Sequence, residues 1–206
     1  MSQSHQVFDL NEFSGPFRAE TDRACAVLGA ALLDEKLKNL FERRLQYAKK
    51  KLLDHSGILG SFASRITVAR SLMWIAEDVR FDLDQIRDIR NKFAHNADHK
   101  LSFSNQSIAA KCGTLRVAQT LLEAQEALAS RPPDHFSPEA ILAMASVIRP
   151  PRQRYEITIE MLAQHLDALE ATHPAYTGPD LRQELWNLGS KEATVTVLVT
   201  NSPGRI

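Results

Sequence analysis

The sequence predicts an all-α protein built as an antiparallel helical bundle, and three observations favour this fold class. Apolar residues recur at intervals of three and four along most of the chain, which is the periodicity of amphipathic helices. Proline pairs at Pro132-Pro133 and Pro150-Pro151 fall between the periodic segments, where they would end helices. The connections between these segments are short, which favours antiparallel neighbours.

Length and composition indicate a soluble globular chain with one domain and appendages, or at most two domains. The chain has 206 residues, of which 44% are hydrophobic and 24% are charged. Its 25 Lys and Arg residues balance 25 Asp and Glu residues, so the formal net charge is zero. A protein without a global basic field does not hold a long nucleic acid by counterion release. Direct DNA binding is therefore not expected.

The cysteine content and the apolar stretches point to the cytoplasm. No apolar stretch approaches the roughly 18 residues of a membrane span, and the N-terminus lacks the pattern of a secretory signal. The two cysteines, Cys25 and Cys112, lie in helix-like apolar surroundings, which predicts two buried free thiols in a reducing compartment. A disulfide between them is the alternative.

The first half of the chain begins with a flexible leader over residues 1–17, interrupted by Ser14-Gly15-Pro16. Residues 20–54 carry helical periodicity and predict one long helix or two consecutive helices. The glycine-containing turn that follows ends in Ser61, whose hydroxyl can cap the next helix. A third helical pattern runs from about Asp78 to His95.

The second half continues with a short extended piece at 101–103 and a helix from Ser107 to about Ser130. Two further helices are expected at 136–147 and 155–171. These elements predict a helical domain over residues 18–172.

Residues 173–206 differ in character and are expected to form an accessory tail. A short helix-like piece at 180–188 is followed by 193–200, which is rich in β-branched residues. The second segment predicts either an edge strand or a partner-binding tail.

One face of the third predicted helix is polar. At about 100° per residue, its polar side chains fall within about 80° of one another, with apolar residues on the other side. The polar residues are Asp84, Arg87, Asn91 and His95. Arg90 lies at the border between the two faces. The pattern is typical of an ordinary amphipathic surface helix, and it is also compatible with a functional site.

The first helix carries a row of small apolar residues that is expected to face a neighbouring helix. This row consists of Ala24, Val27 and Ala31, with Glu20 and Asp34 at its two ends. Carboxylates at the edge of a packed seam need partners. Arg87 and Arg90 are the candidates, and with Asp84 they predict an ion-pair network between the first and third helices. Such a network is either architectural or catalytic.

The residues from Arg90 to His95 resemble the Arg-polar-spacer-His motif of HEPN domains. A wider, ordered set over roughly residues 18 to 120 resembles the mannitol operon repressor (MltR-like) family. That set comprises Glu20-Thr21-Asp22-Arg23, Leu33-Asp34, Gly57 to Phe62, Arg65-Ile66, Asp84 to His95 and Leu101-Ser102-Phe103, with a weaker echo at Arg154-Tyr155. The resemblance does not extend beyond about Thr172.

The two resemblances imply two functions. The MltR-like family implies an all-helical bacterial transcriptional regulator without a recognisable helix-turn-helix, acting through a protein partner. The HEPN motif implies a metal-independent ribonuclease in which Arg90 stabilises the phosphorane charge. His95 would then be the general acid or base, and Asn91 would orient the phosphate or His95. We rank the regulator first, and neither reading needs a cofactor.

Two other groups of residues are candidates for binding sites. The dense basic cluster of Arg43, Arg44, Lys49, Lys50 and Lys51 would contact RNA if RNA is bound, although such clusters are usually solvated helix faces. His95, Asp98 and His99 lack further ligands, so no metal site is expected.

The third helix is also expected to lie near a homodimer interface. Arg90 and His95 are separated by about 140° on a regular helix, so they do not both point into one cleft of a single chain. Two copies related by a two-fold axis would bring both polar faces together. The alternatives are a monomer, and a dimer formed by strand pairing of the tail.

Overall fold

The computed structural model describes residues 10–45, 49–129 and 150–172, and this part of the chain forms eight helices and no strand. The helices are α1 Leu10–Ala19, α2 Asp22–Arg44, α3 Lys49–Leu53, α4 Phe62–Ser71, α5 Glu77–His95, α6 Gln106–Gly113, α7 Arg116–Ala129 and α9 Pro151–Thr172. The predicted all-α fold class is confirmed.

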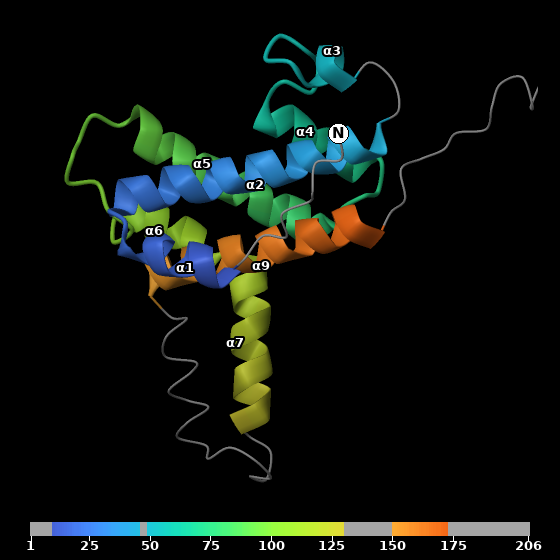
Figure 1. Cartoon of the computed structure of the whole chain (residues 1–206). Coiled ribbons are helices and arrows are strands. Elements are labelled where there is room, and N and C mark those ends of the chain that lie inside the picture. The colour runs from blue at the N-terminus through green and yellow to red at the C-terminus, as the bar shows by residue number, and fades with distance from the viewer. Residues whose placement is uncertain (1–9, 46–48, 130–149, 173–206) are drawn as a thin grey trace, which may run out of the picture.

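The long helices α2, α5 and α9 form the centre of the bundle, and α7 extends away from them (Figure 1). α2 and α9 lie side by side and run in the same direction. Asp22 at the start of α2 pairs with Arg152 at the start of α9 at 2.7 Å, and Arg43 near the end of α2 lies 3.7 Å from Glu170. α5 runs antiparallel to α2 and packs against it.

The core is apolar, with a polar contact at its centre. Tyr155 is fully buried on α9, and its hydroxyl donates a 2.8 Å hydrogen bond to the carbonyl of Ala26 on α2. The rings of Phe93, Phe103 and Tyr155 follow one another with centroids 5.1 Å apart at each step. These tilted contacts join α5, the loop after it and α9.

Buried polar side chains from one helix bind the free ends of another. Asp82 on α5 is fully buried, and its carboxylate accepts the backbone N–H groups of Arg116 at 2.8 Å and Val117 at 2.9 Å. These N–H groups have no partner within α7 because they lie in its first turn. Burial raises the pKa of Asp82, and the two N–H donors act in the opposite direction.

Arginine side chains from other helices likewise donate hydrogen bonds to the free carbonyl groups at the C-terminal ends of helices. The guanidinium of Arg23 on α2 donates to the carbonyls of Phe93, Asn96 and Asp98, at and beyond the end of α5. Arg154 on α9 donates to the carbonyl of Cys112 at 3.0 Å and to that of Gly113. Each guanidinium supplies several donors in a rigid fork, so one side chain satisfies several terminal carbonyls.

Several predicted features are confirmed. α5 covers the third helical pattern, and the hydroxyl of Ser61 accepts the N–H of Ser64 at 3.1 Å, so Ser61 caps α4. Residues 20–54 form two helices, α2 and α3, which was one of the two expected arrangements. Cys25 and Cys112 are buried and free.

Two expectations about local structure are wrong. Ser14-Gly15-Pro16 does not break the chain, because it lies inside α1. Proline costs this helix one hydrogen bond, and the neighbouring Phe17, 3% exposed, anchors it in the core. Residues 107–130 do not form one helix, because α6 ends at Gly113 and Asp82 caps a new helix, α7. Leu101 and Ser102 have no regular secondary structure, and a turn begins at Phe103.

The expected elements at 136–147, 180–188 and 193–200 lie outside the described residues, as does most of the predicted tail. Among the helices that the structure describes, none is long and apolar enough to cross a membrane.

The cap of α7 predicts a specific loss of stability. Replacing Asp82 by Ala removes the acceptor of two buried N–H groups, so the free energy of unfolding should fall by about 2 kcal/mol in urea titrations. Asp78→Ala is the matched control, since the Asp78 side chain is 71% exposed and pairs with Arg116 at the surface. It should change stability by no more than about 0.5 kcal/mol. Equal losses for both variants would contradict this role.

The cysteine environment predicts inert thiols. Burial raises the pKa of Cys25 and of Cys112 to about 12, so the nucleophilic thiolate is scarce near neutral pH. A thiol reagent such as DTNB at pH 8 should leave both cysteines unmodified in the folded protein and label both in urea. Stoichiometric labelling of the folded chain would show that one thiol is accessible.

Candidate functional site

The motif from Arg90 to His95 lies in the last turns of α5, next to the loop that leads to α6. Arg90 and His95 are exposed, and Asn91 is half-buried between them in sequence. Nη1 of Arg90 donates a 3.0 Å hydrogen bond to Oδ1 of Asn91. Of the three side chains of the ribonuclease hypothesis, Arg90 and Asn91 are therefore in direct contact.

A shallow depression at this end contains only part of the motif. It is lined by Asn91, Lys92, His95, Asn96, Ala97, Leu101, Asn105, Ser107 and Ile108. Asn105 caps α6 by accepting the N–H of Ser107 at 3.1 Å. Arg90 is not among the lining residues, so Lys92 and His95 are the groups that would meet an anion there. The arrangement offers amide and imidazole hydrogen bonds without bringing Arg90 and His95 into one cleft.

The acidic and basic residues of the polar face pair with one another along α5. Asp84 accepts from Arg80 at 2.5 Å and lies 3.7 Å from Arg87, and Arg87 also approaches Asp88 at 3.4 Å. These are partly exposed pairs within one helix. Ion pairs of this kind contribute little to stability.

Asp34 does not pair with Arg87 or Arg90 as expected, because Arg65 on α4 occupies that role. Oδ1 of Asp34 accepts from Nε of Arg65 at 2.9 Å and also from its Nη2. The Arg65 side chain is 6% exposed, and its Nη1 donates to the carbonyl of Leu59 at 2.6 Å. The pair ties α4 to α2. Glu20, the other carboxylate of the expected network, is exposed.

The sequence around Arg65 already indicated that this side chain is buried and needs a partner, although helical periodicity alone did not identify the pair. Arg65 is followed by buried Ile66, and both lie on the side of α4 that faces the core. A guanidinium at a buried helix position requires a carboxylate or several carbonyls. Searching for such a partner on α2 would have found Asp34.

The basic cluster is divided between several environments. Arg44 is buried, stacks on the Trp74 ring at 4.7 Å, and donates to the carbonyl of Leu169. Burial lowers the pKa of Arg44. Arg43 approaches Glu170, whereas Lys49, Lys50 and Lys51 on α3 are exposed.

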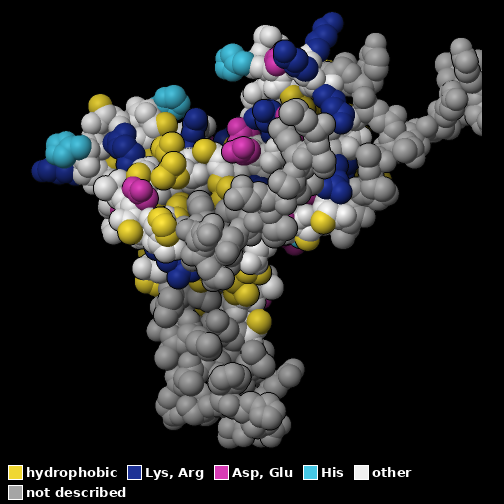
Figure 2. Space-filling view, viewed as in Figure 1, with side chains coloured by type: hydrophobic (Ala, Val, Ile, Leu, Met, Phe, Trp, Pro, Cys, Tyr) yellow, Lys and Arg dark blue, Asp and Glu magenta, His cyan; other side chains and the backbone are white. Residues whose placement is uncertain are grey.

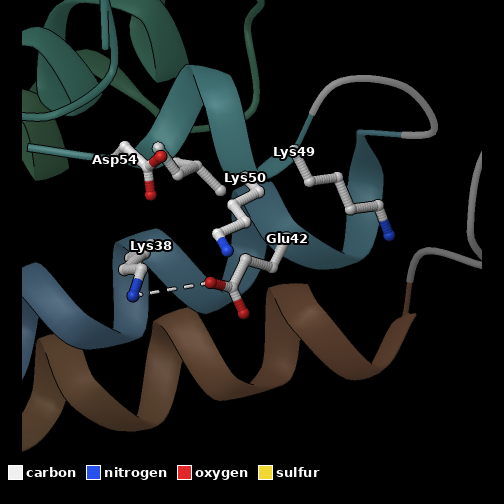
Figure 3. A pocket seen from close by; sticks show the side chains of 6 residues that line it. Lys38, Glu42, Lys49, Lys50 and Asp54 are labelled. Atoms are coloured by element: carbon white, nitrogen blue, oxygen red, sulfur yellow. Dashed lines mark ion pairs between the residues drawn. The ribbon is translucent and has the colours of Figure 1, made fainter. Parts of the chain in front are cut away.

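A pocket lies between the end of α2 and α3, lined by Lys38, Glu42, Lys49, Lys50, Leu53 and Asp54. Lys50 points toward Glu42, and Lys49 points away from it (Figure 3). Nζ of Lys38 lies 3.5 Å from Oε1 of Glu42. Because two carboxylates offset three amines, the lining is not the uniformly basic surface that a nucleic acid prefers.

The row of small apolar residues on α2 does not face a neighbouring helix, contrary to expectation. Ala24 and Val27 are partly exposed, Ala31 is exposed, and Leu28 beside them is 47% exposed. We call these four residues the outer face of α2. Glu20 precedes this face, and exposed Glu35 follows it one turn after Ala31.

α2 packs through a different row, which explains the error. Cys25, Ala26, Gly29, Ala30 and Leu33 are buried against the rest of the bundle. Gly29 allows this packing, since a Cβ there would lie 3.0 Å from Ile159 of α9 and 3.1 Å from Phe17. Because α2 is apolar on both sides, its periodicity does not indicate which side is buried.

The outer face of α2 is exposed or partly exposed apolar surface. Figure 2 shows hydrophobic side chains gathered over α2 and the adjoining part of α5, with acidic side chains nearby. In the part of the chain that the structure describes, no helix covers this area. Contiguous exposed apolar surface commonly marks a site of protein contact.

The ion pairs predict opposite outcomes for two arginines. Arg65→Ala should lower the free energy of unfolding by about 3 kcal/mol, because it leaves the Asp34 carboxylate without its guanidinium. Arg90→Ala should change it by no more than about 0.5 kcal/mol, because Arg90 is exposed. Urea unfolding of both variants measures the difference. A large loss for Arg90→Ala would restore the network predicted from the sequence.

No protein-family model matches the chain, and no curated protein is significantly similar to it. Among solved structures, one chain of the X-ray structure of the MtlR-HPr complex from Escherichia coli is similar, with 22% sequence identity and a TM-score of 0.54. The similarity covers 76% of this chain and 97% of that chain. At this level of identity the likeness establishes a shared fold.

Proposed function

We propose that this chain is a regulatory protein that acts by binding other protein molecules, and that it neither reads DNA directly nor turns over a substrate. The observation that carries this proposal is the outer face of α2. Leu28 lies on a central helix of the bundle and is 47% exposed, among Ala and Val residues that are exposed or partly exposed. Contact with another protein would remove this apolar surface from water, which is energetically favourable.

The fate of the polar residues supports the same proposal. The side chains of Arg23, Asp82 and Arg154 hydrogen-bond to backbone groups at helix ends, and the Asp34 carboxylate accepts hydrogen bonds from Arg65. These groups stabilise the fold and are not available to a substrate. Arg90 and His95, which remain accessible, do not line one depression.

The similar structure was solved as a complex of MtlR with HPr, which makes HPr the first partner to test. The resemblance of the sequence to the mannitol operon repressor family adds the expectation that the regulated process is transcription. The two together favour a regulator that works through protein contacts in a bacterial cell.

Binding to HPr is the direct test. Isothermal titration of the purified chain with Escherichia coli HPr should give saturable binding, with a dissociation constant of about 10 µM or tighter. Lysozyme, titrated under the same conditions, serves as the control for nonspecific attraction. No binding at about 100 µM HPr would count against a partner of this class.

The same preparation should be inert toward RNA. Incubated with mixed RNA in EDTA, wild type and His95→Ala should both leave the RNA intact, because Arg90 and His95 do not share a cleft. Electrophoresis of the RNA gives the readout. Cleavage by wild type that is lost in His95→Ala would replace the regulator with a ribonuclease.

A further inference from the structure

The shallow depression at the end of α5 is rich in hydrogen-bond donors. Lys92 and His95 line it together with three asparagines, Asn91, Asn96 and Asn105, and none of the described residues in its lining carries a carboxylate. The pocket between α2 and α3 differs, because two carboxylates lie among its amines. Lys92 is half-buried, and no described residue pairs with its ammonium group. A partly desolvated cation without a counter-charge favours the binding of an anion.

All three asparagines use their side-chain oxygen within the fold. Oδ1 of Asn96 and Oδ1 of Asn105 each accept the backbone N–H two residues later, at 2.8 and 3.1 Å. Oδ1 of Asn91 accepts from Nη1 of Arg90 at 3.0 Å. Backbone N–H and guanidinium groups only donate, so they fix which end of each amide is oxygen. Each asparagine is left with its Nδ2 group, for which the described residues supply no acceptor.

The walls that carry these donors are held in place by the fold. Nη2 of Arg23, on α2, donates to the carbonyl of Asn96 at 3.0 Å and to that of Asp98 at 2.9 Å, which fixes the loop after α5. Asn105 is fixed as the N-cap of α6. Donors that are positioned before a ligand arrives lose little conformational freedom on binding it.

We propose that this depression binds a phosphate group. A phosphomonoester carries about −1.5 to −2 charges near neutral pH, and its three terminal oxygens are strong acceptors. Amide, ammonium and imidazole donors on several sides suit such a group better than they suit the two oxygens and single charge of a carboxylate. The site shares no residue with the outer face of α2, so it is independent of the protein contact proposed there.

The size of the depression favours a small organic phosphate over the free ion. Its volume is about 460 Å³, which lies in the range of small-molecule sites and exceeds what one phosphate fills. Leu101 and Ile108 also line it and offer apolar surface to the organic part of the ligand. The donors would then hold the phosphate while these two side chains contact the rest of the molecule.

NMR of the full chain tests the site through the asparagine side chains. Glycerol 3-phosphate should shift the Nδ2 signals of Asn91, Asn96 and Asn105 saturably, with a dissociation constant of about 1 mM or tighter. The side chain of Asn39, on α2 and outside the depression, is the internal control and should not respond. Glycerol and acetate at the same concentration should leave all of these signals unchanged, because neither carries a phosphate.

Inorganic phosphate distinguishes the two sources of the group. It should shift the same signals but bind at least about fivefold more weakly than glycerol 3-phosphate, since it makes no contact with the apolar lining. Equal affinities would support the phosphate site and identify the free ion as its ligand.

Two variants test the donors without removing the cap of α6. Asn105→Asp keeps the capping oxygen but replaces the Nδ2 donor by a carboxylate oxygen, so it should weaken binding of glycerol 3-phosphate at least about tenfold. Lys92→Gln should weaken it by a similar factor through the loss of the ammonium charge. Gln106→Glu, the same change of charge at the next residue and outside the lining, is the matched control. It should weaken binding less than about threefold in about 0.15 M salt.

Circular dichroism confirms that each variant is folded. Three outcomes would overturn the proposal: no saturable shift with either phosphate probe up to about 20 mM, equal shifts with acetate, or wild-type affinity in both Asn105→Asp and Lys92→Gln.

Discussion

The bundle depends on satisfying the free backbone groups at helix ends that are brought into its interior. Short connections leave little chain to cover these N–H and C=O groups, so side chains from other helices bind them. Asp82 holds the start of α7, and Arg23 and Arg154 hold the ends of α5 and α6. The same contacts set where the helices cross, because a carboxylate or guanidinium joins two elements only at one relative position. The apolar residues then pack between helices whose relative positions these polar contacts have set.

Periodicity predicted the fold well where a helix has one apolar side. α5 was predicted nearly to the residue, because its apolar residues Ile86, Ile89 and Phe93 contrast with polar neighbours. The same method failed on α2, which is apolar around most of its circumference, and it placed Ala24, Val27 and Ala31 inside. The choice between two apolar sides is made by the partners α9, α5 and α4, which a single helical segment does not encode.

In the candidate site, too, the sequence predicted some features of the contacts and not others. The sequence identified Asp34 as a carboxylate that needs a cation, and that requirement is physical. It did not identify Arg65 as the cation, because the choice between Arg65, Arg87 and Arg90 depends on where α4 and α5 cross α2. Sequence spacing constrains contacts within one helix, as in the pairs of Arg80 with Asp84, but leaves contacts between helices open.

The residues that carry the family resemblance are largely the ones that hold the frame. Arg23, Asp34, Arg65 and Arg154 bind helix ends or one another, so keeping them preserves the fold whatever the molecule binds. The exposed residues of the outer face of α2 do not make such contacts, and Leu28 is not part of the core. A substitution at Leu28 therefore leaves the packing of the core intact. Specificity for a partner can therefore diverge while the bundle is maintained.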